Sequence, residues 1–392
     1  MRRLKLFFIS SALLVCMSAF IWTSCDKDSD GKITEPVIVE PETPDRTVLL
    51  YIIGDNSLSS YASRNIDSIV SGMSKTTTTL QMLVYQDSKE TAPTIWKIEK
   101  DKQGVARKNA LKIYPEEQNS ADPEVMSEII REVFALSGTR EKGLILWSHG
   151  SGWLPSPAFN PDRIGTLSFG PDMDSYLELW DIRKVLEKTG LHFDFIGFDA
   201  CLMSGVEVAY ELKDQTDYLI ASPTEIMGIG FPYQTIVPVL GRTALDLPAM
   251  CDAYMQFFNG SVGKDGTISL INTAYLDDLA ACYAQILKQT TLPDALNGKT
   301  IQQMGRRIPY TSADHTNIFY DMGDIVTNLS TPLYSQFNTI LNQAVVYKNN
   351  TPRFVTFDIR SNSGLTVFIP ELNPDRQYQS AYPFLQWYQA TR

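Results

Sequence analysis

Three long apolar runs constrain the fold of this chain more than any other feature. They are residues 46–54 ("RTVLLYIIG"), 143–147 ("GLILW") and 192–200 ("HFDFIGFDA"), and they are almost continuously apolar rather than alternating. Strands with this pattern are buried on both faces, as in a parallel sheet that helices cover on each side. With 392 residues, 44% of them hydrophobic, the chain is long enough to build such a core.

Helical patterns alternate with these runs. A helix is predicted over 122–138, where Asp122 and Pro123 mark its start. Two more are predicted to open at capping-box motifs, "SYLE" at 175–178 and "SGVE" at 204–207. This order of elements predicts an α/β fold, a mostly parallel β-sheet with helices on both faces.

The last third of the chain has a mixed pattern. Helices are predicted near 246–259 and 273–289, and the segments "FVTFDI" and "GLTVFIP", joined by "RSNS", predict a hairpin. We therefore expect a core at 46–245 and a C-terminal α/β region at 246–392 that packs on this core.

The first 24 residues have the pattern of a signal peptide. Three basic residues lie within the first five positions, and an apolar stretch follows over 6–22. The run "WTSC" resembles a bacterial lipoprotein cleavage box, which makes Cys25 the expected lipidated residue. The alternative is an ordinary secretory signal in which the cysteine occurs by chance.

Residues 25–45 are expected to form a lipid-anchored, flexible tether, because the segment after Cys25 is acidic and Pro-rich and has no helical or strand period. Its "KDSD" resembles surface-export signals of some Gram-negative gut lipoproteins. The expected location is therefore outside the cytoplasm, at the bacterial outer membrane or cell surface. The formal net charge of −11 would become −14 after removal of residues 1–24, which disfavours a nucleic-acid binder.

The cysteines of the folded part differ in their settings. Cys251 and Cys282 lie in amphipathic helical patterns and are expected to be core residues. Cys201 instead follows a buried strand at the point where the sequence turns polar. Three cysteines are an odd number, so at least one thiol stays free even in an exported protein.

His149 and Cys201 follow two of the predicted strands at equivalent positions. If these strands are neighbours in a right-handed crossover, their carboxyl ends bring the imidazole and the thiol together. A thiolate with a nearby imidazole is suited to nucleophilic catalysis, and Gly150 and Cys201 N–H groups can stabilise an oxyanion. The alternative for each residue alone is a structural role, as a core cysteine or a hydrogen-bonded loop histidine.

Several blocks of the sequence resemble the clostripain family of cysteine peptidases. The blocks are "ILWSHGSGW", "FIGFDACLMSGVEVAYELKDQTDYLIASPTE", "YIIGDNSLSSYA" and "SNSGLTVFIP", and the resemblance runs from residue 46 to the C-terminus. The family has the caspase-like fold of caspases, legumains and gingipains. The resemblance implies that His149 and Cys201 form the catalytic dyad of an endopeptidase acting on protein or peptide substrates.

The resemblance also implies a preference for a basic P1 residue. In the family the Asp two residues before the nucleophile lines the S1 pocket, and Asp199 occupies this position. Family members often carry a second acid in a "GWDY" segment, where this chain has "GFPY" with Pro232. Ser222 and Glu225, after the next strand, are expected to border the pocket.

Two further properties follow from the family alone. Members are often activated by a cut between the His and Cys blocks, and Arg163 is the one basic residue of the long loop there. Calcium dependence also occurs in the family, although the sequence has no local calcium-loop pattern and no metal-spaced Cys/His cluster. We expect no other cofactor.

The sequence therefore predicts an exported, lipid-anchored cysteine endopeptidase that is cut near Arg163. Two alternatives stay open. One is a surface lipoprotein of the same fold that binds without catalysis, and the other is a peptidase without basic P1 specificity.

Overall fold

The first strand of the main sheet lies between two other strands and is fully buried. In the computed structural model every residue of β1 (Arg46–Gly54) is buried. The structure describes residues 44–76, 80–101, 103–155, 168–260, 265–306, 317–373 and 375–392. Thr43–Arg392 forms one compact unit.

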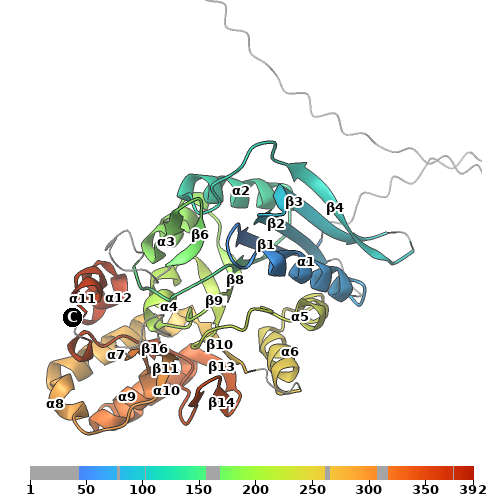
Figure 1. The fold of residues 1–392 in the computed structure, drawn as a ribbon. Coiled ribbons are helices and arrows are strands. Elements are labelled where there is room, and N and C mark those ends of the chain that lie inside the picture. Colours follow the sequence, from blue (N-terminus) through green and yellow to red (C-terminus); the bar gives the residue numbers. More distant parts are fainter. Residues whose placement is uncertain are drawn as a thin grey trace, which may run out of the picture. The chain divides into compact units, whose positions relative to one another are not determined.

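The main sheet has nine strands in the order β13-β10-β9-β8-β5-β1-β2-β3-β4 (Figure 1). Beside β1 they are β2 (Leu80–Ser88), β3 (Thr91–Lys100), β4 (Ala106–Ile113), β5 (Glu141–Trp147), β8 (Phe193–Asp199), β9 (Thr216–Ala221), β10 (Thr267–Asn272) and β13 (Val345–Asn350). The five central strands, from β9 to β2, pair in parallel, and the strands outside them pair antiparallel. The predicted mostly parallel α/β sheet is confirmed.

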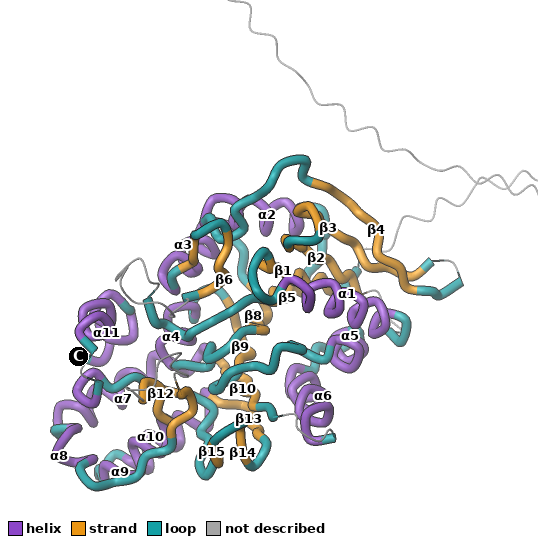
Figure 2. Tube along the Cα trace, in the orientation of Figure 1, coloured by secondary structure: helices purple, strands orange, loops and turns teal. Residues whose placement is uncertain are grey.

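Helices cover both faces of this sheet (Figure 2). The helix bounds are α1 Ser59–Met73, α2 Pro123–Ala135, α3 Leu179–Thr189, α4 Val206–Leu212, α5 Tyr233–Leu240, α6 Leu247–Asn259, α7 Leu276–Gln289, α8 Leu292–Leu296, α9 Met322–Leu329, α10 Tyr334–Ala344, α11 Arg376–Ala381 and α12 Gln386–Thr391. On one face of the sheet, the β1 residues Leu50 and Ile52 share a core with α1, α5 and α6. On the other face, the alternate β1 residues Leu49 and Tyr51 share a core with α2, α3, α4 and α7. This double cover explains why the central strands lack an alternating pattern.

Small sheets and short 3₁₀ helices complete the unit. The remaining elements are β6 (Phe169–Asp172), β7 (Ser175–Leu177), β11 (Gln303–Arg306), β12 (Asn317–Asp321), β14 (Arg353–Phe354), β15 (Phe357–Asp358), β16 (Thr366–Val367), η2 (Thr273–Tyr275), η3 (Pro370–Leu372) and η4 (Tyr382–Phe384). β6 pairs with β7, β14 pairs with β15, and β11, β12 and β16 form a three-stranded sheet.

The capping box expected at Ser175 is wrong. Ser175 begins β7, and helix α3 starts four residues later, at Leu179 with Glu178 as its N-cap. The Ser175 hydroxyl accepts a hydrogen bond of 2.8 Å from the Asn119 side-chain amide, so a partner far along the chain takes the atom that would have capped the helix. The predicted end of this helix at Gly190, in the left-handed conformation, is confirmed.

The second capping box, at Ser204, is also wrong. Helix α4 begins at Val206 with Gly205 as its N-cap and has no side-chain cap. The Ser204 hydroxyl donates to the Gly364 carbonyl at 2.6 Å, and Glu207 accepts from the Phe368 N–H at 2.8 Å. Both side chains bind the C-terminal region instead of their own helix.

The hairpin expected near the C-terminus has a different pairing. β14 begins one residue before the first predicted strand, β15 lies within that strand, and the two pair with each other, while β16 pairs with β12. The strand β4 was not predicted, because it has no continuous apolar run and seven of its eight residues are exposed at the edge of the sheet.

The C-terminal region contributes directly to the main sheet, since β10 pairs with β9 and β13 pairs with β10. The boundary between residues 245 and 246 stays a prediction. Across the described residues, the helices are too short or too polar for a transmembrane span.

Candidate active site

The register of β5 and β8 brings the two catalytic candidates to the same edge of the sheet. These strands are parallel neighbours, and Trp147 pairs with Asp199 at their carboxyl ends. His149 and Cys201 each lie two residues beyond this last pair. The expectation that the two strands are adjacent is therefore confirmed.

Gly150 lies against the turn that carries Cys201. A Cβ atom at Gly150 would lie 2.8 Å from the Cys201 carbonyl oxygen and 3.1 Å from both the Ala200 Cβ and the Met203 sulfur. No other residue fits at this position without a shift of backbone atoms. The chain after His149 and the chain around Cys201 are thus in close backbone contact.

The turn that carries Cys201 is tied to the loop after β9. Leu202 has a φ of +66°, which is rare for a residue with a side chain, and its N–H donates to the Thr224 carbonyl at 2.9 Å. The Ile226 N–H donates to the Cys201 sulfur at 3.3 Å. Backbone conformations this rare often occur at active sites and ligand-binding sites.

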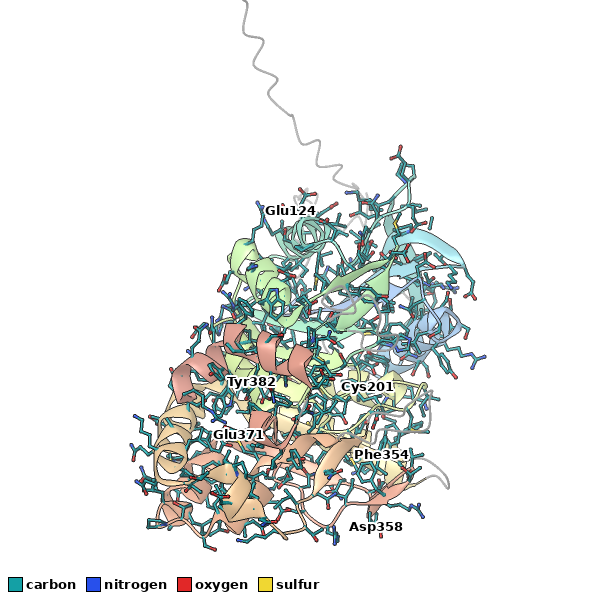
Figure 3. All side chains as sticks on the ribbon, turned by 60° about the vertical axis from the view of Figure 1, so that its left-hand side comes forward. Glu124, Cys201, Phe354, Asp358, Glu371 and Tyr382 are labelled. Atoms are coloured by element: carbon teal, nitrogen blue, oxygen red, sulfur yellow. The ribbon has the colours of Figure 1, made fainter. Side chains whose placement is uncertain are left out.

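Cys201 differs in exposure from the other cysteines of the folded part. Cys251 and Cys282 are buried, as expected, whereas Cys201 is partly exposed. Figure 3 shows Cys201 near the boundary between the green elements and the orange elements of the C-terminal region. A reagent or substrate therefore has better access to Cys201 than to the other two thiols.

The environment of Cys201 favours the thiol over the thiolate. Burial, with the carboxylates of Glu225 and Asp199, raises the pKa of Cys201 to about 12, and the Ile226 N–H only partly opposes this shift. At neutral pH the sulfur is protonated, so it needs a base to become a nucleophile.

His149 has the properties of such a base. It is partly buried, and burial lowers its pKa below the usual value, so the imidazole is neutral at pH 7. Its Nε2 atom lies 2.8 Å from the hydroxyl oxygen of Ser57. Sequence reasoning missed Ser57, because an exposed serine after a strand has no distinguishing pattern.

The Asp199 carboxylate is buried in the site and is held there by hydrogen bonds. Its Oδ2 atom accepts hydrogen bonds of 2.9 Å from both the Phe231 N–H and the Tyr233 hydroxyl. The side chain is almost fully buried, and burial raises its pKa to about 7. The "GFPY" segment, which has Pro232 where family members often have an acid, thus supplies two donors to this carboxylate.

Ser222 and Glu225, the two residues expected to border the pocket, differ in their exposure. The Ser222 side chain is fully buried and shares a 2.6 Å hydrogen bond with the Thr267 hydroxyl. Glu225 is partly exposed and close enough to Cys201 to raise its pKa, and burial raises its own pKa to about 7. Glu225 is therefore the more accessible of the two.

The C-terminal region forms one wall of the site. A Cβ at Gly305 in β11 would lie 2.7 Å from the Leu202 side chain, and a Cβ at Gly152 would lie 2.9 Å from the Phe319 ring of β12. Trp153, which follows closely after His149, is fully buried with its ring centroid 4.8 Å from that of Phe368. Sequence reasoning did not identify this contribution.

Two predicted positions lie outside the described residues. Cys25 is in the segment 1–43, and Arg163 is in the segment 156–167. As for calcium, the described residues contain no group of three or more His, Cys, Asp or Glu side chains that could hold a metal ion, so we derive no step through a metal.

Comparisons with known proteins show the family of the chain. The model of the clostripain family, peptidase C11, matches residues 50–392. No curated protein is similar enough to this chain to count as a match.

Solved structures of C11 proteases are similar over most of the chain. An inactive zymogen C11 protease from Parabacteroides distasonis is 32% identical with a TM-score of 0.77, covering 90% of this chain and 99% of that one. A secreted C11 cysteine protease from Bacteroides thetaiotaomicron, iotapain, is 27% identical with a TM-score of 0.79, covering 90% and 100%.

A secreted C11 protease from Bacteroides thetaiotaomicron in complex with an irreversible peptide inhibitor is 30% identical with a TM-score of 0.75, covering 88% of this chain and 98% of that one. The family match spans most of the sequence, and it includes both strands whose ends carry His149 and Cys201. The chain therefore belongs to the clostripain family of cysteine proteases.

Proposed function

We propose that the chain is an endopeptidase in which Cys201 is the nucleophile and His149 is the general acid and base. The register of β5 and β8 carries this proposal, because it sets both residues two positions beyond the pair of Trp147 and Asp199. His149 takes the proton from the Cys201 thiol, and the sulfur attacks the peptide carbonyl. His149 then protonates the leaving amine, and water hydrolyses the thioester.

The N–H groups of Gly150 and Cys201 would stabilise the oxyanion of the tetrahedral intermediate. The bridge between Gly150 and Phe169 uses the Ser151 N–H and the His149 carbonyl, which leaves the Gly150 N–H out of that bridge. Removal of one such donor costs about 2.7–4 kcal/mol of transition-state stabilisation in a well-studied protease.

A basic P1 residue fits the charge of the site. Asp199 and Glu225 are both near Cys201, and neither forms an ion pair within the described residues. Asp199 already accepts two hydrogen bonds from the "GFPY" segment, whereas Glu225 is partly exposed. We therefore assign the larger part of P1 recognition to Glu225. Asp199 would hold the "GFPY" segment in place and add negative charge to the pocket. Ser222 supports the pocket from within.

Export and lipid anchoring are part of the proposal. Residues 1–24 would be removed as a signal peptide, Cys25 would be lipidated, and residues 26–45 would link it to the protease. The neighbour iotapain is described as secreted, which supports export. The test is metabolic labelling with a radioactive fatty acid, which should label the wild-type chain and not Cys25→Ala.

Self-processing at the Arg163–Ile164 bond is also proposed. One similar structure is described as an inactive zymogen, which supports activation by a cut. N-terminal sequencing of the purified wild-type chain should find a new terminus at Ile164. The Cys201→Ala variant should stay intact, and its maturation in pure form would contradict self-cleavage.

The main experiment is cleavage of a peptide library by residues 26–392. The wild type should cleave after Arg or Lys, Cys201→Ala should be inactive, and the buried thiol variant Cys282→Ala should keep its activity. Cleavage after uncharged residues would support a peptidase without basic specificity. No cleavage by the matured wild type under reducing conditions, with and without calcium, would support the binding lipoprotein and overturn the proposal.

A further inference from the structure

The loop between β1 and α1 is hydrogen-bonded to the segment that carries His149. The Ser148 hydroxyl donates to the Ile53 carbonyl at 2.7 Å, and Ser148 directly precedes His149. The Asn56 side-chain amide donates to the same carbonyl at 2.9 Å and to the Pro171 carbonyl at 3.2 Å. These bonds fix the loop next to His149 without using the imidazole.

Ser57 occupies the middle of this fastened loop. Asn56 precedes it, and the Leu58 N–H, directly after it, donates to the Asn56 side-chain oxygen at 2.9 Å. The backbone is therefore held on both sides of Ser57. Its hydroxyl oxygen lies 2.8 Å from Nε2 of His149, so the geometry exists before any substrate binds.

A histidine that acts as a base needs a hydrogen bond at the ring nitrogen that does not exchange the proton. The hydrogen bond at one ring nitrogen decides which tautomer forms and how the ring is oriented. Among the described residues, no carboxylate pairs with His149, and burial alone accounts for the lowering of its pKa. Ser57 is the side chain that the structure offers for this role.

The proton positions follow from this contact. If Nδ1 is to accept the Cys201 proton, the neutral ring must carry its own proton on Nε2, and Nε2–H then donates to the Ser57 oxygen. When Nδ1 gains the proton, Nε2–H still donates to the same oxygen. Ser57 thus serves both protonation states without reorientation.

We propose that Ser57 is a positioning residue that holds Nε2 of His149, so that Nδ1 is free to exchange protons with Cys201 and with the leaving amine. This inference rests on the proposed role of His149. It adds a third side chain to the site, one that orients the base without touching the substrate.

The tautomer can be measured without activity. The chain has three histidines, so ¹⁵N-histidine spectra of the wild type and His149→Ala assign the His149 ring directly. We expect the Nε2–H tautomer in the wild type and a tautomer mixture in Ser57→Ala. An Nδ1–H ring in the wild type, or an unchanged spectrum in Ser57→Ala, would overturn the inference.

Kinetics provide the second test. Ser57→Ala should lower kcat about fivefold to tenfold, the effect of one lost hydrogen bond, with little change in KM. Ser57→Thr should restore kcat, and Ser60→Ala, at an exposed position of α1, should match the wild type. In a His149→Ala background, Ser57→Ala should have no further effect.

Two results separate this inference from the proposed function. Full activity of His149→Ala would refute the role of His149, and with it any catalytic role of Ser57. A normal loss of activity in His149→Ala, with Ser57→Ala equal to Ser60→Ala, would refute the role of Ser57 alone.

Discussion

Gly150 and Cys201 are in such close contact that a Cβ atom on Gly150 would lie 2.8 Å from the Cys201 carbonyl oxygen. Real Cβ atoms do not approach an oxygen this closely, so a side chain at Gly150 would push the two loops apart. In the proposed mechanism these loops carry the base, the nucleophile and both oxyanion donors. The proposal therefore requires that the two loops stay at this distance.

Gly150→Ala should abolish most activity while the protein stays folded. We expect kcat to fall by at least about a hundredfold, the effect of one misplaced oxyanion donor. The matched control is Gly197→Ala in β8, where a Cβ would lie 3.4 Å from the nearest atom, an ordinary contact. Peptide hydrolysis and circular dichroism of both variants check this. Similar losses of activity in the two variants would show that the contact is not specific to catalysis.

The preference for basic P1 residues should increase with pH. Burial raises the pKa of both Asp199 and Glu225 to about 7, so both carboxyls are largely neutral at pH 6 and ionised at pH 8. The ratio of kcat/KM for an Arg substrate to that for a norleucine substrate should rise between these pH values. A ratio that does not change with pH would contradict the assignment of these carboxyls to P1 recognition.

Two variants show which of the two carboxyls causes the pH-dependent preference for basic P1 residues. Glu225→Gln should remove most of the pH-dependent rise, and Asp199→Asn should remove a smaller part. Asn at 199 retains an oxygen that can accept from the Phe231 N–H and the Tyr233 hydroxyl, so the loop should stay in place. A larger effect of Asp199→Asn would reverse the assignment.

Glu225→Gln should also make Cys201 more reactive. The Glu225 carboxylate helps to raise the pKa of the Cys201 thiol, so its removal lowers that pKa and increases the thiolate fraction. Alkylation by iodoacetamide at pH 8 should become faster, while hydrolysis of Arg substrates becomes slower. Glu128→Gln, at an exposed position of α2, is the control and should change neither rate.

The sequence predicted those parts of the site that depend on the central strands. β5 and β8 are buried between other strands, so their apolar runs are long and their ends are clear in the sequence. His149 and Cys201 could be matched because each follows such an end by the same number of residues. The edge strand β4 has no such run, because water covers most of its side chains.

The parts that the sequence did not predict depend on contacts between distant segments. Ser204 and Ser175 have the spacing of a capping box, but their hydroxyls bind Gly364 and Asn119. Ser57 became a candidate only when the fold brought it to His149. Local motifs cannot show which partner a polar side chain finds across the fold.

Glu207 should make the folded protein less stable as the pH rises. Its carboxyl accepts from the Phe368 N–H at 2.8 Å and from the Tyr382 hydroxyl at 3.0 Å, and it is fully buried in α4. Burial raises its pKa from 4.5 to about 7. The contribution of Glu207 to stability is therefore fully present below about pH 4.5 and is lost as the pH rises through about 7.

Glu207→Gln keeps an oxygen acceptor for both donors and cannot ionise. Between pH 4.5 and pH 8 the wild type should lose unfolding free energy relative to this variant, by roughly 3 kcal/mol at most. Urea unfolding at several pH values measures it, and Glu128→Gln provides the control for an exposed glutamate. A difference that is constant with pH would mean that Glu207 ionises as readily in the folded protein as in the unfolded chain.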